Sequence, residues 1–192
     1  MKILFLDIDG VLNSSRTALV TPMKSKTFKQ IMIDGMDKTA VAMVNRLCKD
    51  NNLLIVLSSS HRYDYLLPGT VAVEGGFSRD QVDLFRMGLY LEELGLDYTL
   101  VIDATPDITT PTRTRGDEIN RWLELNEGLN IENFIILDDV DQFHGVTQFR
   151  DELSDHFVKC DANEGFSFKN YRDCEKILGI DNDKVHIILP PK

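Results

Sequence analysis

The chain has 192 residues, of which 43% are hydrophobic and 27% are charged. This length and balance predict a single domain over residues 1–192, because a chain of this size can bury a substantial core of its own. The net charge of −10 argues against general attraction to polyanions such as nucleic acids or acidic membranes. No apolar run approaches the roughly 18–20 residues of a membrane span. The N-terminus also lacks the features of a signal peptide, so we expect a cytoplasmic protein with no membrane partner.

Two details of composition qualify this picture. The three cysteines are odd in number and show no CxxC spacing, which argues against a disulfide framework or a zinc site. Basic residues are unevenly spread: Lys24, Lys26 and Lys29 cluster in MKSKTFK, and Arg113 and Arg115 in TRTRGDE. Either cluster could receive a phosphate if it lay beside an acidic site, although lysines in such a run more commonly form a solvated face.

Short apolar runs predict five strands. They lie at residues 3–6, 53–57, 99–102, 134–137 and 157–158. The first four are continuous rather than alternating, which is typical of strands buried on both faces.

Amphipathic stretches with apolar spacing near 3.6 lie between the strands and predict helices over 36–52, 78–96 and 116–126. Ser78 resembles an N-cap and Gly95 a C-terminal stop for the second helix. The expected buried faces are Val41, Val44 and Leu47 or Cys48 in the first helix, Val82, Phe85, Leu89 and a later leucine in the second, and Ile119, Trp122 and Leu123 in the third. Strands that alternate with helices predict a parallel sheet covered on both faces.

The long irregular segments all follow predicted strands, at residues 13–34, 60–76 and 104–114. In an open parallel sheet, the loops after the strands gather on the edge where ligands bind. The same edge collects a distinctive set of polar residues: Asp7 and Asp9 after the first strand, Ser58, Ser59 and Arg62 after the second, and Asp138, Asp139 and the more distant Asp141 after the fourth. Carboxylates that converge from two strands suit Mg²⁺, which offsets their mutual repulsion.

These residues resemble the motifs of the haloacid dehalogenase (HAD) superfamily. DIDGVLN matches the DxDGxx signature, LLIVLSSS resembles the second motif, and FIILDDVD resembles the fourth. Arg115 in RTRGDEINRWL is the best match to the third motif, a Lys or Arg before the fourth strand. Within the superfamily, IVLSSSHR, RGDEINRWL, ILDDVD and KCDANEGFS look most like the HAD domain of RNA repair proteins, which is related to polynucleotide 3′-phosphatases. The chain departs from that pattern at His61, where an aromatic residue, usually Trp, is expected.

The resemblance implies an α/β fold of the HAD type, a Rossmann-like three-layer sandwich. Its five-stranded parallel sheet would have the order 5-4-1-2-3, with helices on both faces. Residues 13–34 would form at most a small cap or lid, which leaves the site open.

The resemblance also implies roles for the catalytic residues. Asp7 would attack phosphorus and form an aspartyl-phosphate. Asp9 would protonate the leaving oxygen and later deprotonate the attacking water. Ser58 and Arg115 would hold the phosphoryl oxygens as charge develops on them. Gly10 would provide the sharp turn between the two aspartates.

Metal and substrate ligands are implied in the same way. Asp7 and Asp138 would bind Mg²⁺ directly, Asp9 through its backbone carbonyl, and Asp139 as a ligand or an outer group. The substrate contacts assigned from the sequence are Gly10, Ser59 and Arg62. Two choices stay open: either Ser58 or Ser59 contacts the phosphate, and Arg62 is either a surface charge or a phosphate contact. The remaining histidines, and His61 itself, default to structural roles.

The expected function is Mg²⁺-dependent hydrolysis of a phosphomonoester. An open site favours a large phosphorylated substrate, such as a nucleic-acid 3′ end, and nothing in the sequence calls for an obligate protein partner. One alternative is a nucleotide or small-molecule phosphatase. Another, from a different class, is a non-catalytic phosphate-binding module or a phospho-accepting receiver, but a receiver has its paired acids after the first strand, whereas here the pair follows the fourth.

Overall fold

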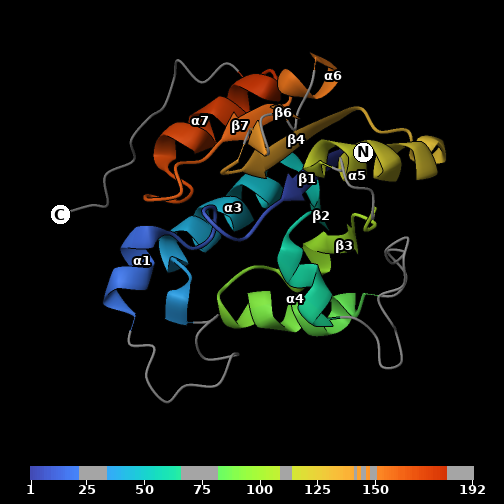
Figure 1. Ribbon diagram of the computed structural model, residues 1–192. Coiled ribbons are helices and arrows are strands. Elements are labelled where there is room, and N and C mark those ends of the chain that lie inside the picture. The colour runs from blue at the N-terminus through green and yellow to red at the C-terminus, as the bar shows by residue number, and fades with distance from the viewer. Residues whose placement is uncertain are drawn as a thin grey trace.

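A parallel five-stranded sheet forms the centre of the protein (Figure 1). The computed structural model describes residues 1–21, 34–65, 82–108, 114–140, 142–143, 146–147 and 151–180. The strands are β1 (Lys2–Leu6), β2 (Leu53–Leu57), β3 (Val101–Ala104), β4 (Asn133–Asp138) and β7 (Phe157–Lys159). Their order is β3-β2-β1-β4-β7 and every pairing is parallel, which confirms the predicted order 5-4-1-2-3. A separate antiparallel pair joins β5 (Gln142–Phe143) to β6 (Val146–Thr147).

Helices cover both faces of the sheet. The longer ones are α3 (Lys38–Asn51), α4 (Leu84–Glu93), α5 (Arg115–Leu125) and α7 (Phe168–Ile177). The short ones are α1 (Ser15–Val20), α6 (Asp151–Ser154) and the 3-10 helices η1 (Ser60–Tyr65), η3 (Tyr98–Leu100) and η4 (Glu127–Leu129). Figure 1 shows α3 and α7 on one side of the sheet and α5 on the other. No helix in the described ranges is long and apolar enough to cross a membrane.

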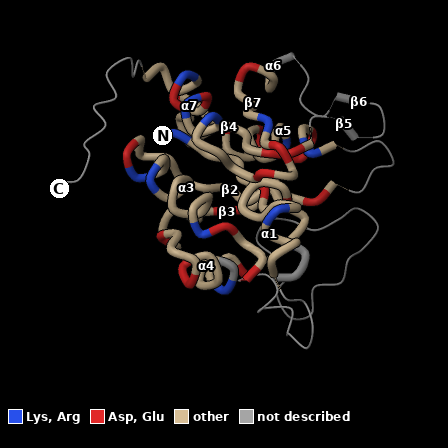
Figure 2. The backbone as a smooth tube through the Cα atoms, turned by 90° about the vertical axis from the view of Figure 1, so that its left-hand side faces the viewer, with Lys and Arg blue, Asp and Glu red and all other residues tan. Residues whose placement is uncertain are grey.

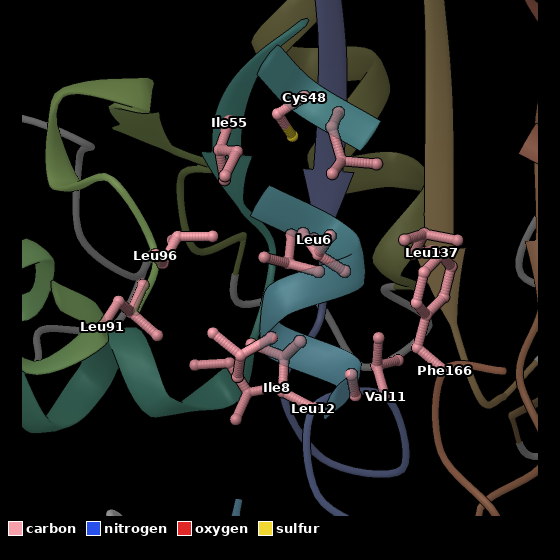
Figure 3. Packing of buried hydrophobic residues seen from close by; sticks show 14 of the residues in the cluster. Leu6, Ile8, Val11, Leu12, Cys48, Ile55, Leu91, Leu96, Leu137 and Phe166 are labelled. Carbon is pink, nitrogen blue, oxygen red and sulfur yellow. The ribbon is translucent and has the colours of Figure 1, made fainter. Parts of the chain in front are cut away.

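Strand β1 divides the core into two layers because successive side chains point to opposite faces. Leu4 and Leu6 belong to the cluster that packs under α3, α4 and α7, whereas Ile3 and Phe5 belong to the cluster under α5. Figure 3 shows Leu6, Ile55 and Leu137, from three adjacent strands, in the first of these layers. Most side chains of the three central strands β1, β2 and β4 are buried on both faces, which explains their continuous apolar runs in the sequence.

The predicted faces of two helices are confirmed. In α3, Val41, Val44, Leu47 and Cys48 are all fully buried. In α5, Ile119 and Trp122 are fully buried and Leu123 is partly buried against the same cluster. The Trp122 indole also donates a hydrogen bond of 2.8 Å to the Asp103 carboxylate of β3, so its polar group is satisfied within the core.

The third strand begins later than predicted. The sequence placed it at residues 99–102, but β3 starts at Val101 because η3 occupies the preceding residues. The Asp97 carboxylate accepts hydrogen bonds from the Thr99 amide at 3.1 Å and from the Thr99 hydroxyl at 2.6 Å. This local cap competes with extended backbone and delays the strand by two residues.

The predicted face of the second helix is only partly correct: Val82, just before α4, is buried as expected, but Phe85 and Leu89 are not. The helix begins at Leu84 with Asp83 as its N-cap, and Ser78 lies outside the described residues. Leu91 is buried at 1% exposure, whereas Phe85 is 66% exposed and packs edge-on against Tyr98. Leu89 is likewise 38% exposed. Gly95 does follow the end of the helix with a positive φ of 98°, as its role as a stop signal requires.

Charged residues of both signs are mixed along the described helices (Figure 2). Exposed ion pairs such as Arg46–Asp50 and Lys169–Asp173 lie one helical turn apart. Such surface pairs contribute little to stability, at most about 1 kcal/mol each. The stability of the fold therefore depends mainly on its two apolar layers.

The corrected face of α4 can be tested by paired substitutions. We expect Leu91→Ala to lower the free energy of unfolding by about 2–4 kcal/mol, because it leaves a cavity in the core. Leu89→Ala is the matched control and should change it by no more than about 0.5 kcal/mol. Urea denaturation measures both. A loss at Leu89 as large as that at Leu91 would show that Leu89 is buried as the sequence predicted.

Candidate active site

The ends of β1 and β4 bring three carboxylates together. Asp7 directly follows β1, Asp138 ends β4, and Asp139 comes next. One carboxylate oxygen from each lies within 4.8 Å of the others. The backbone fixes two of these side chains, because the Ile8 amide donates to Asp7 Oδ1 at 2.7 Å and the Val140 amide donates to Asp138 Oδ1 at 2.9 Å. The acidic cluster predicted from the sequence is therefore assembled at the strand ends.

The cluster is electrostatically unfavourable on its own. Burial raises the pKa of Asp138 to about 7, and the neighbouring negative charge of Asp7 is the second cause of this rise. Burial and the Asp7 charge also raise the pKa of Asp139. Asp138 Oδ2 is buried and accepts no hydrogen bond from any residue that the structure describes. An orphaned oxygen beside two more carboxylates is a donor set that fits a hard divalent cation, so the cluster could hold a metal ion.

Arg115 lies beside two of these carboxylates. Its Nη2 is 3.7 Å from Asp7 Oδ2 and its Nε is 3.6 Å from Asp138 Oδ2. It is the first residue of α5, whose start is fixed by Thr114 and Asp117 in a reciprocal capping box. The third-motif arginine suggested by the sequence thus reaches the acidic cluster from a well-defined helix start.

Asp9 points to a different place. Its carboxylate is not part of the acidic cluster: Oδ1 accepts a 2.7 Å hydrogen bond from Asn13 Nδ2, and Oδ2 lies 3.0 Å from His61 Nε2. The hydrogen bond from His61 is the main cause that lowers the pKa of Asp9, with a smaller contribution from Asn13, against the opposing effect of burial. The two aspartates of the DxD motif therefore face different environments.

Gly10 makes this separation feasible. It has a φ of +67°, and a Cβ at this position would lie 2.4 Å from Asp139 Cγ. Its amide donates to Asn13 Oδ1 at 2.9 Å. The sequence assigned Gly10 both the turn and a substrate contact; the structure supplies the turn, and the amide is engaged by Asn13.

The two serines after β2 differ in what they contact. Both side chains are buried. Ser59 Oγ accepts a hydrogen bond from the His61 amide at 3.3 Å, whereas Ser58 Oγ has no hydrogen-bond partner within the described part of the chain. A buried hydroxyl without a partner is costly, which favours Ser58 as the group reserved for a ligand.

Arg62 corrects a sequence prediction. It was assigned to substrate binding, but it is 1% exposed and turned into the interior. Its Nη1 donates to the carbonyls of Ser58 and Ser59 at 3.0 and 2.6 Å, and its Nη2 pairs with Glu118 of α5. The sequence could not place this contact because the partner lies 56 residues away. Arg62 therefore joins the loop after β2 to the helix that carries Arg115.

The sequence reading also missed Asn13, His61 and Glu118. Asn13 ends the stretch DIDGVLN, and His61 stands where the resembling domains carry an aromatic residue, so both had a signal that received no role. Lys24, Lys26, Lys29, Arg113 and Asp141 lie outside the described residues.

The buried ion pair should be strongly coupled. We expect Arg62→Met alone to lower the free energy of unfolding by about 3–5 kcal/mol, because it removes the arginine that pairs with the buried Glu118 carboxylate. Adding Glu118→Leu should restore part of this loss, so that the double-mutant cycle gives a coupling of about 1 kcal/mol or more. The exposed pair Arg121–Glu124 on the same helix is the control, with a coupling below about 0.5 kcal/mol. Equal coupling in both cycles would contradict a structural role for Arg62.

Removing one carboxylate from the cluster should stabilise the metal-free protein. We expect Asp138→Asn to raise the melting temperature by about 2–4 °C at mildly alkaline pH, where the wild-type carboxyl is ionised, which corresponds to about 1 kcal/mol. The same variant should lose the increase in melting temperature that Mg²⁺ gives the wild type. Asp173→Asn, at an exposed ion-paired site on α7, is the control. An Asp138→Asn variant that responded to Mg²⁺ like the wild type would remove Asp138 from the metal site.

A comparison with protein families agrees with this geometry. The model of the HAD domain in Swiss Army Knife RNA repair proteins matches residues 3–171. No curated protein and no solved structure matches the chain. The matched range runs from β1 into α7 and includes every residue of the site described above. The chain therefore belongs to the family of HAD domains found in Swiss Army Knife RNA repair proteins.

Proposed function

We propose that the chain is a Mg²⁺-dependent phosphomonoester hydrolase that acts through an aspartyl-phosphate on Asp7. Its HAD domain implies a phosphatase-type hydrolase. The observation that carries the finer proposal is the division of the DxD motif: Asp7 lies in the acidic cluster beside Arg115, while the carboxylate of Asp9 lies outside it. Two carboxylates two residues apart can then perform different chemistry.

Asp7 is suited to act as the nucleophile. The Ile8 amide occupies Oδ1, whereas Oδ2 faces the Arg115 guanidinium. In the first step, a carboxylate oxygen forms a bond to phosphorus as the bond from phosphorus to the ester oxygen breaks, and Asp9 gives its proton to the departing oxygen. In the second step, Asp9 removes a proton from water, which attacks phosphorus and releases phosphate from Asp7. Together, the two displacements replace one difficult hydrolysis with two easier steps.

The surrounding residues would stabilise the charge on the transferred phosphoryl group. Arg115 supplies a cation at the N-terminus of α5, and the Ser58 hydroxyl, which bonds to none of the described residues, supplies a neutral donor. Mg²⁺ bound by Asp7, Asp138 and Asp139 would offset the remaining negative charge. Asp9 was also expected to offer its backbone carbonyl to the metal, and that contact stays a prediction. The residues thus fit phosphoryl transfer better than simple storage of an anion.

A nucleic-acid 3′-phosphate is the substrate class we favour. The family description refers to RNA repair proteins, and the segment at 13–34 allows only a small cap, so a large substrate end could reach the site. In the view of Figure 2, Lys and Arg are interspersed with Asp and Glu along the described elements. Recognition would therefore depend on the phosphorylated end itself more than on the length of the chain behind it.

The nucleophile assignment predicts loss of activity in Asp7→Asn. We expect kcat/KM to fall by at least about 10³-fold, because an amide cannot form the acyl phosphate. The measurement is Mg²⁺-dependent phosphate release, with Asp173→Asn as the matched control at an exposed site on α7. Trapping of radioactive phosphate on the wild type, but not on Asp7→Asn, would identify the intermediate. Full activity of Asp7→Asn would rule out this mechanism.

The substrate is identified by assaying a panel with the same protein. It contains RNA and DNA oligonucleotides with 3′-phosphates, oligonucleotides with 5′-phosphates, mononucleotides and an aryl phosphate. We expect the highest kcat/KM on a 3′-phosphorylated oligonucleotide. Faster turnover of mononucleotides would point to a nucleotide or small-molecule phosphatase, and inactivity on the whole panel would favour a phosphate-binding module.

A further inference from the structure

We propose that His61 is a positioning residue for Asp9, and that it and Asn13 together hold the Asp9 carboxylate clear of the acidic cluster and aimed at the leaving oxygen. This inference rests on the proposed function, in which Asp9 acts as the acid and base. The role is distinct from that of the cluster, because His61 reaches only the aspartate whose carboxylate lies outside it.

The contacts form a clamp with two sides. Asn13 Nδ2 donates to Oδ1 of Asp9 at 2.7 Å, and His61 Nε2 lies 3.0 Å from Oδ2. Asn13 is itself fixed, because its Oδ1 accepts the Gly10 amide at 2.9 Å. Each oxygen of the carboxylate thus has a nitrogen neighbour from a different segment of the chain, Asn13 through a hydrogen bond and His61 through a 3.0 Å ion-pair contact. A carboxylate held at both oxygens has little freedom to rotate.

Hydrogen bonds to neighbouring residues fix the segment that carries His61. The His61 amide bonds to Ser59 Oγ, and the buried Arg62 guanidinium binds the carbonyls of Ser58 and Ser59. The His61 side chain is only 14% exposed, whereas that of Asp9 is 56% exposed. A ring that is mostly enclosed therefore supports a carboxylate that is open to solvent and substrate. This is the arrangement expected of a fixed residue that orients a reactive one.

Asp9 needs such support because of its neighbours. It lies next to Gly10, whose turn brings the chain against Asp139, and two residues from Asp7. Any cation that the acidic cluster binds would attract the Asp9 carboxylate toward the cluster and away from the substrate. Donors at both oxygens oppose that movement. Because these contacts favour the ionised form of Asp9, a proton taken up by this carboxyl is released readily, so the clamp should matter most for the step in which Asp9 delivers that proton to the leaving oxygen.

Substrates with leaving groups of different acidity distinguish a positioning role of His61 from a nonspecific loss of activity in the variant. An alkyl ester such as a sugar 3′-phosphate has a basic leaving oxygen and depends on proton donation, whereas p-nitrophenyl phosphate has an acidic leaving group that departs with little help. For His61→Phe, which keeps an aromatic ring but lacks the donor, we expect kcat to fall about 10- to 100-fold on the alkyl substrate. The fall on p-nitrophenyl phosphate should be less than about 3-fold, since proton donation contributes little there.

Three further variants make the result decisive. His61→Gln, whose amide can offer a donor near the Nε2 position, should recover part of the activity on the alkyl substrate. In an Asp9→Asn background, His61→Phe should have less than about 2-fold further effect, because the residue it positions is no longer an acid. His156→Gln is the control, since this ring stacks on Phe134 and contacts its carbonyl rather than the site. Melting temperatures of the metal-free proteins report whether each variant folds.

The outcomes distinguish this inference from the proposed function. If the wild type hydrolyses both substrates and His61→Phe slows them equally, or slows neither, His61 does not act through Asp9 and the inference fails alone. A full effect of His61→Phe in the Asp9→Asn background would overturn it as well. If the wild type hydrolyses no phosphoester, the proposed function fails and the role of His61 fails with it.

Discussion

The register of the three central strands is the constraint on which the site depends. Leu57, Leu6 and Leu137 are aligned across β2, β1 and β4. The next residues of these strands are Ser58, Asp7 and Asp138, so one row across the sheet carries a hydroxyl and two carboxylates. Adjacent strands are about 4.8 Å apart, which places these groups close enough to share one ligand. A shift of one residue in any strand would turn its side chain to the opposite face and dismantle the row.

Because this register places two carboxylates side by side, their repulsion must be offset by a positive group that lies outside the sheet. Like charges in a buried row repel, and the raised pKa values of Asp138 and Asp139 record that cost. Arg115 offsets part of it from the start of α5. The position of α5 is in turn fixed by Glu118, which pairs with Arg62 in the loop after β2. A buried ion pair adds little stability of its own, but it sets the geometry of the two segments that it joins. His61 and Arg115 are thereby held in place by one interior contact.

The sequence predicted the parts of this structure that depend on local pattern. Continuous apolar runs located the strands, and the order of the motifs located Asp7, Asp138 and Asp139 at one edge. Predictions failed where a short polar contact competed with the apolar pattern. Asp97 delayed β3, and Asp83 set the start of α4, whose buried face leaves out two of the residues expected on it.

The inward turn of Arg62 was beyond sequence reasoning for a different physical reason. A lone arginine after a strand gives no indication of its direction, because direction depends on which acceptors the fold brings near. Here Glu118 and two backbone carbonyls supply them. His61 was missed in the same way, since its partner Asp9 precedes it by 52 residues and the two meet only when β1 and β2 pair. Pairwise contacts between adjacent strand ends are where a single sequence is least informative.

Gly10 affects both the acidic cluster and the clamp around Asp9, because its backbone conformation and its lack of a side chain bear on both. Its positive φ turns the chain so that Asp9 faces Asn13 and His61, and its missing Cβ leaves the space that the Asp139 carboxylate fills. A side chain at this position would meet Asp139 at 2.4 Å and would also strain the turn. The residue that keeps Asp9 out of the cluster is therefore the one that lets Asp139 enter it. This is why two carboxylates so close in sequence can occupy separate environments on one strand end.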